Sequence, residues 1–161
     1  MVLLVPLASA AQSADTSDPA QLAASGQQAL REARYAEAQA DFESLAKLEP
    51  GIAEIHATLG AIDFKLRAYE KSVHEVQTAL RLKPSLPRLD SLLGLSLAEL
   101  GRFKEALPRL EMVFKQTSDR ETRRMCGLQL LRAYSGLGRD ADAVETSLEL
   151  NKLYPDDPEV Q

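Results

Sequence analysis

The sequence has only one cysteine, Cys126, no tryptophan, and aromatic residues at just 5% of the chain. A single thiol cannot form an internal disulfide, so the fold depends on a hydrophobic core. Cys126 lies in an apolar stretch, and we interpret it as a small buried hydrophobic residue. Valine and isoleucine are also scarce, at 10 residues against 27 leucines and 23 alanines, which favours helices and excludes an all-β fold.

The chain also lacks a sustained run of lysine and arginine, and its formal net charge is −5 over 161 residues. Binding to duplex nucleic acid requires a basic surface that displaces counterions from the phosphates, so we expect no nucleic-acid partner. The length is that of one domain, and the charged fraction of 27% is typical of an ordinary globular protein.

An apolar run at the N-terminus, VLLVPLASA, ends in three small residues. This pattern is typical of a secretory signal peptide, although the basic segment that normally precedes the run is missing. The run is too short to cross a bilayer, which takes about 20 residues. We expect residues 1–11 to be a clipped signal peptide and residues 12–18 a polar linker. The mature chain would then be periplasmic or secreted, without membrane insertion, and a cytoplasmic location is the alternative.

The rest of the chain repeats with a period of 34 residues. Each unit has a glycine, a small residue twelve positions later, an apolar residue four positions after that, and a proline or serine at the end. In chain order these are Gly26, Ala38, Phe42 and Pro50; Gly60, Ser72, Val76 and Pro84; Gly94, Ala106, Leu110 and Ser118. A fourth unit keeps Ala143 and Pro155 twelve apart, with three residues added to its first half. A repeat of this length indicates helix pairs that stack on one another.

Apolar residues three and four positions apart predict two helices in each unit. The expected pairs are 20–32 with 36–47, 53–66 with 69–81, 87–99 with 103–115, and 119–136 with 140–153. The expected repeats are 19–52, 53–86, 87–120 and 124–157. Asp157-Pro158-Glu159 resembles the helix start at Asp18-Pro19-Ala20, so we expect residues 158–161 to begin a further helix.

Two local signals bear on the ends of the helices. Ser118 to Glu121 has the spacing of a capping box with Ser118 as the N-cap. Pro108 falls inside an expected helix, where we expect it to introduce a kink or delay the start.

The spacing of Leu59-Gly60, Leu93-Gly94, Tyr134 and the small and apolar residues that follow resembles the tetratricopeptide repeat. The resemblance covers residues 19–157. The initial aromatic residue of the pattern is absent from every unit, and only Tyr134 keeps its tyrosine. The resemblance implies an all-α fold, a right-handed α-solenoid of about four helix-turn-helix repeats.

It also implies a concave groove, lined by the first helices, that holds an extended or helical peptide. Carried over to this sequence, the groove residues are Ala23, Gln27, Leu30, Arg31, Ala57, Thr58, Ala61, Phe64, Lys65, Arg88, Ser91, Leu95, Gln129 and Arg132. The family members that clamp a carboxylate terminus use lysine and asparagine at set places. Here those places hold Ala23, Gln27, Thr58 and Leu92, with only Arg88 retained, so that activity is not supported.

Residues with catalytic spacing are missing. His56 and His74 have no metal-spaced companion, and the sequence has no nucleophile elbow, phosphate-binding glycine loop or cysteine cluster. We therefore expect a non-catalytic protein-interaction scaffold without cofactor or metal, and hold a catalyst as the least favoured class. The alternative is an assembly module, because Val144, Leu148 and Leu150 in the last helix have no visible cover and could drive self-association.

Overall fold

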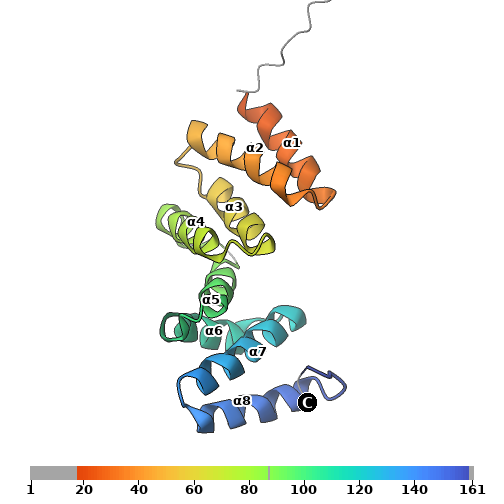
Figure 1. Cartoon of the computed structure of the whole chain (residues 1–161), viewed down its shortest axis with the longest axis vertical. Coiled ribbons are helices and arrows are strands. Elements are labelled where there is room, and N and C mark those ends of the chain that lie inside the picture. The colour runs from red at the N-terminus through yellow and green to blue at the C-terminus, as the bar shows by residue number, and fades with distance from the viewer. Residues whose placement is uncertain (1–17, 87, 160–161) are drawn as a thin grey trace, which may run out of the picture.

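The computed structural model describes residues 18–86 and 88–159, and this part of the chain contains eight α-helices and no strand (Figure 1). The helices form four consecutive pairs, here called repeats 1 to 4. Their bounds are α1 Pro19–Arg31, α2 Tyr35–Leu48, α3 Ala53–Lys65, α4 Tyr69–Leu82, α5 Leu89–Glu99, α6 Phe103–Gln116, α7 Arg120–Gly136 and α8 Asp140–Leu153. All eight helices were expected, and their ends differ from the predicted ones by at most two residues. The predicted signal peptide and nearly all of the linker lie outside the described residues.

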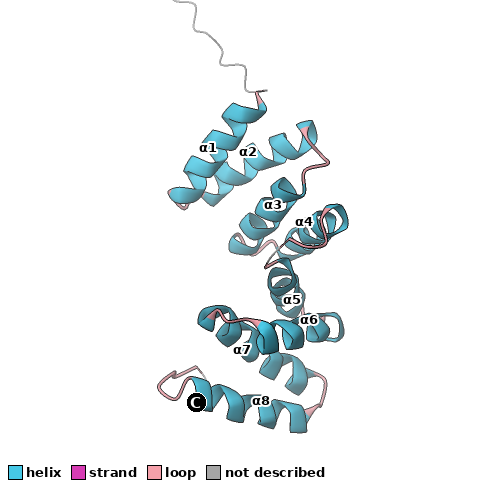
Figure 2. Cartoon of the chain, turned by 180° about the vertical axis from the view of Figure 1, so that it is seen from behind, coloured by secondary structure: helices cyan, strands magenta, loops and turns pink. Residues whose placement is uncertain are grey.

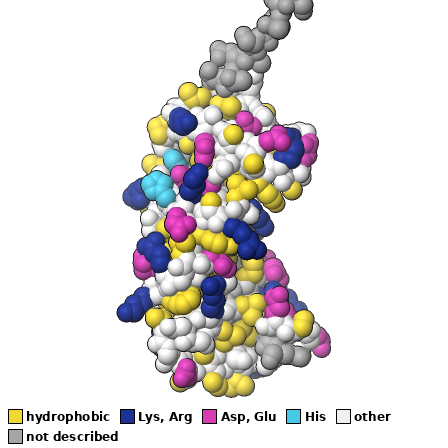
Figure 3. Space-filling model, viewed as in Figure 1, with side chains coloured by type: hydrophobic (Ala, Val, Ile, Leu, Met, Phe, Trp, Pro, Cys, Tyr) yellow, Lys and Arg dark blue, Asp and Glu magenta, His cyan; other side chains and the backbone are white. Residues whose placement is uncertain are grey.

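The helices stack in chain order from α1 to α8, and short turns join them (Figure 2). α5 packs directly on α3 and on α7 as well as on its sequence neighbours, so it lies at the centre of the stack. Eight of its 11 residues are buried. None of the described helices has the length and apolar character that crossing a membrane requires. Exposed hydrophobic side chains lie among charged ones on the face shown in Figure 3.

The repeating glycines allow the two helices of a repeat to come close together. In the first three repeats a Cβ on the glycine would meet a side chain sixteen residues later, at 2.8, 2.5 and 3.0 Å respectively. The pairs are Gly26 with Phe42, Gly60 with Val76, and Gly94 with Leu110. The glycines therefore lie in equivalent places in successive repeats, as the 34-residue period predicts.

The turn inside each repeat places one residue in the left-handed region, with φ between +56° and +70°. Gly101 and Gly138 fill this position in repeats 3 and 4, where glycine has no steric penalty. Ala33 and Arg67 fill it in repeats 1 and 2. The same turn geometry therefore recurs whether or not the sequence supplies a glycine.

Pro108 does not delay the start of its helix, so this part of the prediction was wrong. α6 runs without interruption from Phe103 to Gln116 with the proline inside it. Pro108 cannot donate to the carbonyl of Lys104, and both residues are exposed, so water can satisfy that carbonyl.

The helix caps agree with the sequence at one end of the array and differ at the other. Asp18 caps α1, because its Oδ1 accepts a hydrogen bond from the Ala20 N–H at 3.0 Å, and proline follows it. The cap of α7 is Asp119 and not Ser118, since the Asp119 carboxylate accepts from the Thr122 N–H at 2.7 Å. Aspartate serves this position as well as serine does, which explains the shift by one residue.

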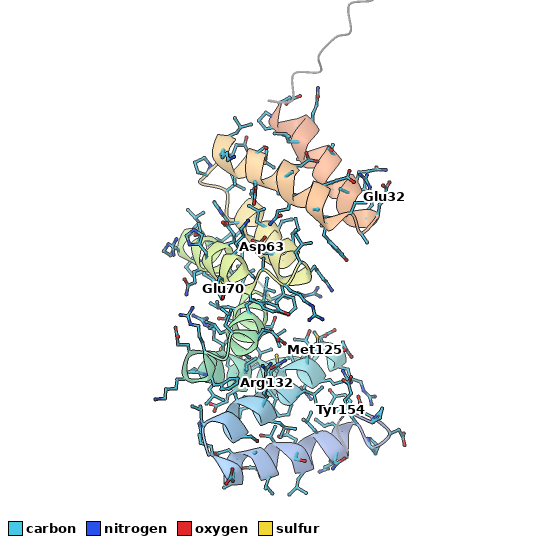
Figure 4. The ribbon with its side chains drawn as sticks, in the orientation of Figure 1. Glu32, Asp63, Glu70, Met125, Arg132 and Tyr154 are labelled. Carbon is cyan, nitrogen blue, oxygen red and sulfur yellow. The ribbon has the colours of Figure 1, made fainter. Side chains whose placement is uncertain are left out.

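The last helix is more buried than the sequence suggested. Leu150 is fully buried, against the expectation that it lacks cover, and it lies close to Gly127 of α7. Val144 and Leu148 are 60% and 66% exposed, as expected. Tyr154 follows the helix and is buried beside the start of α7, where its hydroxyl donates to the carbonyl of Arg120 at 2.7 Å (Figure 4).

The segment after Tyr154 folds back onto α7. Arg124 of α7 forms ion pairs with Asp157 and Glu159, and the Asp157 carboxylate accepts the Glu159 N–H at 2.9 Å. This last contact resembles the one that starts α1. Residues 158 and 159 form a turn, and the rest of the predicted further helix lies outside the described residues.

Candidate functional site

The inner face of the stack opens between repeats 1 and 2. First helices pack directly on one another from α3 to α5 and from α5 to α7, whereas no Cα atom of α1 lies within 8 Å of one of α3. A cleft of about 640 Å³ fills this interval. We call it the α1–α3 cleft, and its lining residues are Asp18, Pro19, Ala20, Ala23, Gln27, Leu30, Phe42, Leu45, Glu49, Ile52, Glu54, Ile55 and Thr58.

The floor of the cleft is apolar and comes mostly from α2 and the segment that follows it. Phe42, Leu45 and Ile55 are almost fully buried in the core of repeats 1 and 2 and show only their edges to the cleft. Ile52 is 39% exposed, which is unusual for a large hydrophobic side chain. These four residues were missed from the sequence because only first helices were expected to line the groove.

The walls carry four of the predicted groove residues. Ala23, Gln27 and Leu30 project from α1, and Thr58 faces them from α3. The Thr58 hydroxyl donates to the carbonyl of Glu54 at 2.8 Å, which leaves its methyl group for contact. Within the described residues the exposed Gln27 side chain has no hydrogen-bond partner. The walls therefore offer small apolar surfaces with one free amide.

The other predicted groove residues of repeats 1 and 2 lie outside this cleft. Arg31 and Lys65 are exposed in the last turns of α1 and α3, and Ala61 is exposed on α3. Ala57 is half-buried, and the half-buried ring of Phe64 packs edge-on against Tyr69 with centroids 5.5 Å apart.

Two predicted groove residues of repeat 3 are wrong. Ser91 and Leu95 are buried, with 9% and 7% of their surfaces exposed, because α5 is covered on both sides by α3 and α7. The Ser91 hydroxyl is also engaged, donating to the carbonyl of Arg88 at 2.7 Å. Arg88 is exposed and lies just before α5 in the left-handed region, with φ +67°.

The predicted groove residues of repeat 4 form a polar cluster with α5. The Gln129 amide donates to Glu99 at 2.9 Å, and Arg132 pairs with the same carboxylate at 3.4 Å while its guanidinium lies over the Phe103 ring. Figure 4 shows Arg132 on α7. Because these side chains satisfy one another, this part of the inner face offers fewer free groups than the α1–α3 cleft.

The arrangement of the helices matches solved structures of repeat proteins. YrrB, described as a TPR protein with an unusual peptide-binding site, superposes with a TM-score of 0.76 at 20% identity, over 91% of this chain and 74% of that chain. MamA from Desulfovibrio magneticus RS-1 gives 0.74 at 23% identity, over 91% and 80%. The pilF protein of Pseudomonas aeruginosa gives 0.69 at 18% identity, over 91% of this chain and 66% of that chain.

The chain has the tetratricopeptide repeat fold. It is therefore a right-handed solenoid of helix pairs, as the repeating glycines predict. No protein-family model matches the sequence, and the comparison with curated proteins gives no match. At identities of 18 to 23%, the structural likenesses establish the fold alone.

Buried polar side chains connect neighbouring tetratricopeptide repeats. Asp63 on α3 is only 2% exposed, and its carboxylate accepts a hydrogen bond from the Gln39 amide of α2 at 2.6 Å. Ser72 and Ser96 form a second link, with their hydroxyl oxygens 2.9 Å apart between repeats 2 and 3. Such paired polar groups fix the register of the stack, since sliding one helix would leave them buried without partners.

The pKa of Asp63 is raised above its ordinary value, mainly because burial disfavours the charged carboxylate. The Gln39 hydrogen bond and the Lys71 ammonium lower the pKa, whereas Glu75 and Glu43 raise it further. The folded state therefore holds a proton at Asp63 more tightly than the unfolded state does. As the pH rises through the folded pKa, the carboxylate ionises and the fold loses stability.

Asp63→Asn is accordingly expected to raise the Tm at pH 7, by about 2 to 4 °C for each kcal/mol of relieved penalty. The gain over wild type should shrink as the pH falls through the acidic range, because wild-type Asp63 then becomes neutral too. Circular dichroism melts between pH 3.5 and pH 7.5 measure this. Asp156→Asn, which neutralises an exposed carboxylate, is the control and should show no such gain. A lower Tm for Asp63→Asn at pH 7 would contradict the account.

The titratable groups do not assemble a reactive centre among the described residues. No cluster of three or more histidine, cysteine, aspartate or glutamate side chains in residues 18–86 and 88–159 could hold a metal. His56 is tied to the Glu75 carboxylate at 2.7 Å and to the carbonyl of Pro50 at 3.0 Å. Burial raises the pKa of Cys126 to about 12, which keeps the thiol protonated and unreactive.

Proposed function

We propose that this chain is a non-catalytic protein-interaction scaffold that binds a peptide segment, extended or helical, in the α1–α3 cleft. The observation that carries the proposal is the apolar floor of Phe42, Leu45, Ile52 and Ile55 at the junction where neighbouring first helices fail to touch. A hydrophobic groove with a few polar groups on its walls is the usual form of a peptide-recognition site.

The dimensions of the cleft suit a short segment. It follows α1 from Pro19 to Leu30, and a helix of this length extends over about 18 Å. An extended peptide of about five or six residues covers the same distance. The titles of two solved structures with this fold add support: YrrB is described by its unusual peptide-binding site, and a Sti1 domain is described in complex with pHsp70.

A single substitution in the wall tests the proposal. Ala23→Glu places a longer, charged side chain into the cleft, where it should exclude an apolar guest. We expect the affinity for a peptide selected on the wild-type chain from a displayed random library to fall at least tenfold. Fluorescence anisotropy with the labelled peptide measures the change.

Ala36→Glu on the exposed surface of α2 is the matched control, because it adds the same group outside the cleft. Its affinity for the peptide should equal that of the wild type, and circular dichroism should show both variants folded. Selected peptides that bind the wild type and Ala23→Glu equally well would reject the cleft as the binding site.

The exposed surface of α8 favours assembly as a second candidate function. Val144 is 60% exposed, whereas Val73 and Leu107, which occupy the corresponding place in repeats 2 and 3, are 4% and 6% exposed. The next repeat covers those two residues. If assembly through α8 is the function, the sedimentation coefficient of the purified chain should rise with concentration, and Leu148→Lys should abolish the rise.

A further inference from the structure

The α1–α3 cleft carries charge of one sign at one end. Asp18, Glu49 and Glu54 line it where α1 and α3 begin, and neither lysine nor arginine is among its lining residues. The nearest basic ends of the same helices, Arg31 and Lys65, belong to the opposite, C-terminal turns. The cleft is therefore polarised along its length, acidic at one end and flanked by basic residues beyond the other.

Two of the three carboxylates already have partners. Asp18 caps α1 by accepting the Ala20 N–H at 3.0 Å. Glu54 accepts a hydrogen bond from the Lys83 ammonium at 2.7 Å, and the same contact lowers the pKa of Glu54. A lysine side chain of the protein itself thus already occupies part of this acidic end.

Glu49 is the carboxylate without a counter-charge. It forms no ion pair within the described residues, although it is half-buried at the edge of the cleft. It is also the C-cap of α2, where the helix ends in carbonyl groups and the helix dipole is negative. A cation placed here would interact favourably with both the carboxylate and the helix end.

We propose that the segment bound in the α1–α3 cleft carries a lysine or arginine next to aliphatic residues, with its cation at Glu49 and the C-terminal end of α2. This inference rests on the proposed function and names the chemistry of the partner. The aliphatic side chains contact Phe42, Leu45 and Ile52, and the basic group lies at the acidic end, which fixes the direction of the segment.

Two designed peptides test the inference. Both are capped dodecapeptides with four leucines, and three lysines in one are replaced by three glutamates in the other. We expect the wild-type chain to bind the lysine peptide at least tenfold more tightly by fluorescence anisotropy at 50 mM salt. Raising the salt to 500 mM should reduce the difference, because exposed charges are then screened within a few ångströms.

Glu49→Gln should weaken binding of the lysine peptide at least threefold and leave the glutamate peptide unchanged. The matched control is Glu145→Gln, which removes the same charge from the exposed surface of α8 and should bind both peptides as the wild type does. An equal loss in the two variants would show that net charge alone attracts the peptide, and the assignment to Glu49 would be wrong.

The remaining outcomes separate this inference from the proposed function. Equal affinity for the two peptides overturns the inference, while the cleft still binds. Failure of both peptides, with a library-selected peptide still lost in Ala23→Glu, also overturns the inference and leaves the proposed function standing. The proposed function itself fails only when Ala23→Glu has no effect on any bound peptide.

Discussion

Replacing Leu110 with alanine is expected to lower the free energy of unfolding by about 2 to 5 kcal/mol. Leu110 is fully buried in the core that joins repeats 2 to 4, and its side chain lies against Gly94 of α5. Truncation leaves a cavity that the neighbouring helices cannot fill without moving the whole stack. Urea denaturation followed by circular dichroism at 222 nm measures the loss.

Leu148→Ala is the matched control for this substitution. It removes the same atoms from a side chain that is 66% exposed, so the free energy of unfolding should change by less than about 0.5 kcal/mol. A comparable loss in both variants would show that the surface of α8 is covered in solution. A small loss in Leu110→Ala alone would contradict the tight packing of α5 on α6.

Gly60→Ala is expected to destabilise the fold by about 1 to 3 kcal/mol, although alanine is the better helix former. Within an exposed helix this change usually stabilises by about 0.5 to 1 kcal/mol. Here the new Cβ would lie 2.5 Å from Cγ2 of Val76 and 3.3 Å from the Val76 backbone nitrogen. The two helices of repeat 2 must then move apart, and this cost exceeds the gain in propensity.

Gly51→Ala and a double variant complete the test. Nothing lies within 4 Å of a Cβ at Gly51, and its φ is not positive, so alanine there should be neutral or slightly stabilising. In a Val76→Ala background, Gly60→Ala should cost less than it does in the wild type, because the clashing methyl group is gone. Equal costs in both backgrounds would mean that the contact with Val76 does not cause the loss.

The sequence predicted part of the candidate cleft. Ala23, Gln27, Leu30 and Thr58 line it because the period places first-helix residues of successive repeats on one inner face. Leu95 was misplaced because the spacing cannot show how deeply a given helix is covered. α5 is packed by neighbours on both sides, so its inner residues became core.

The floor of the cleft could not be predicted in the same way. Phe42 and Leu45 were expected only as layers between repeats, and whether their edges reach solvent depends on how far α1 lies from α3. One sequence signal was available, namely Ile52, a large hydrophobic residue directly before a helix start. The charge of the cleft is similarly a property of positions, because Asp18, Glu49 and Glu54 lie far apart along the chain.

By itself, the sequence determined eight helices, their pairing and their equivalence. A 34-residue comb of glycines and small residues leaves the paired helices one way to approach closely, and their apolar faces leave one way to be buried. Only the tertiary structure decided which faces close and which stay open. The contact between each pair of neighbouring first helices depends on the summed shapes of many side chains, and a small difference at one junction separated α1 from α3 and left a cleft there.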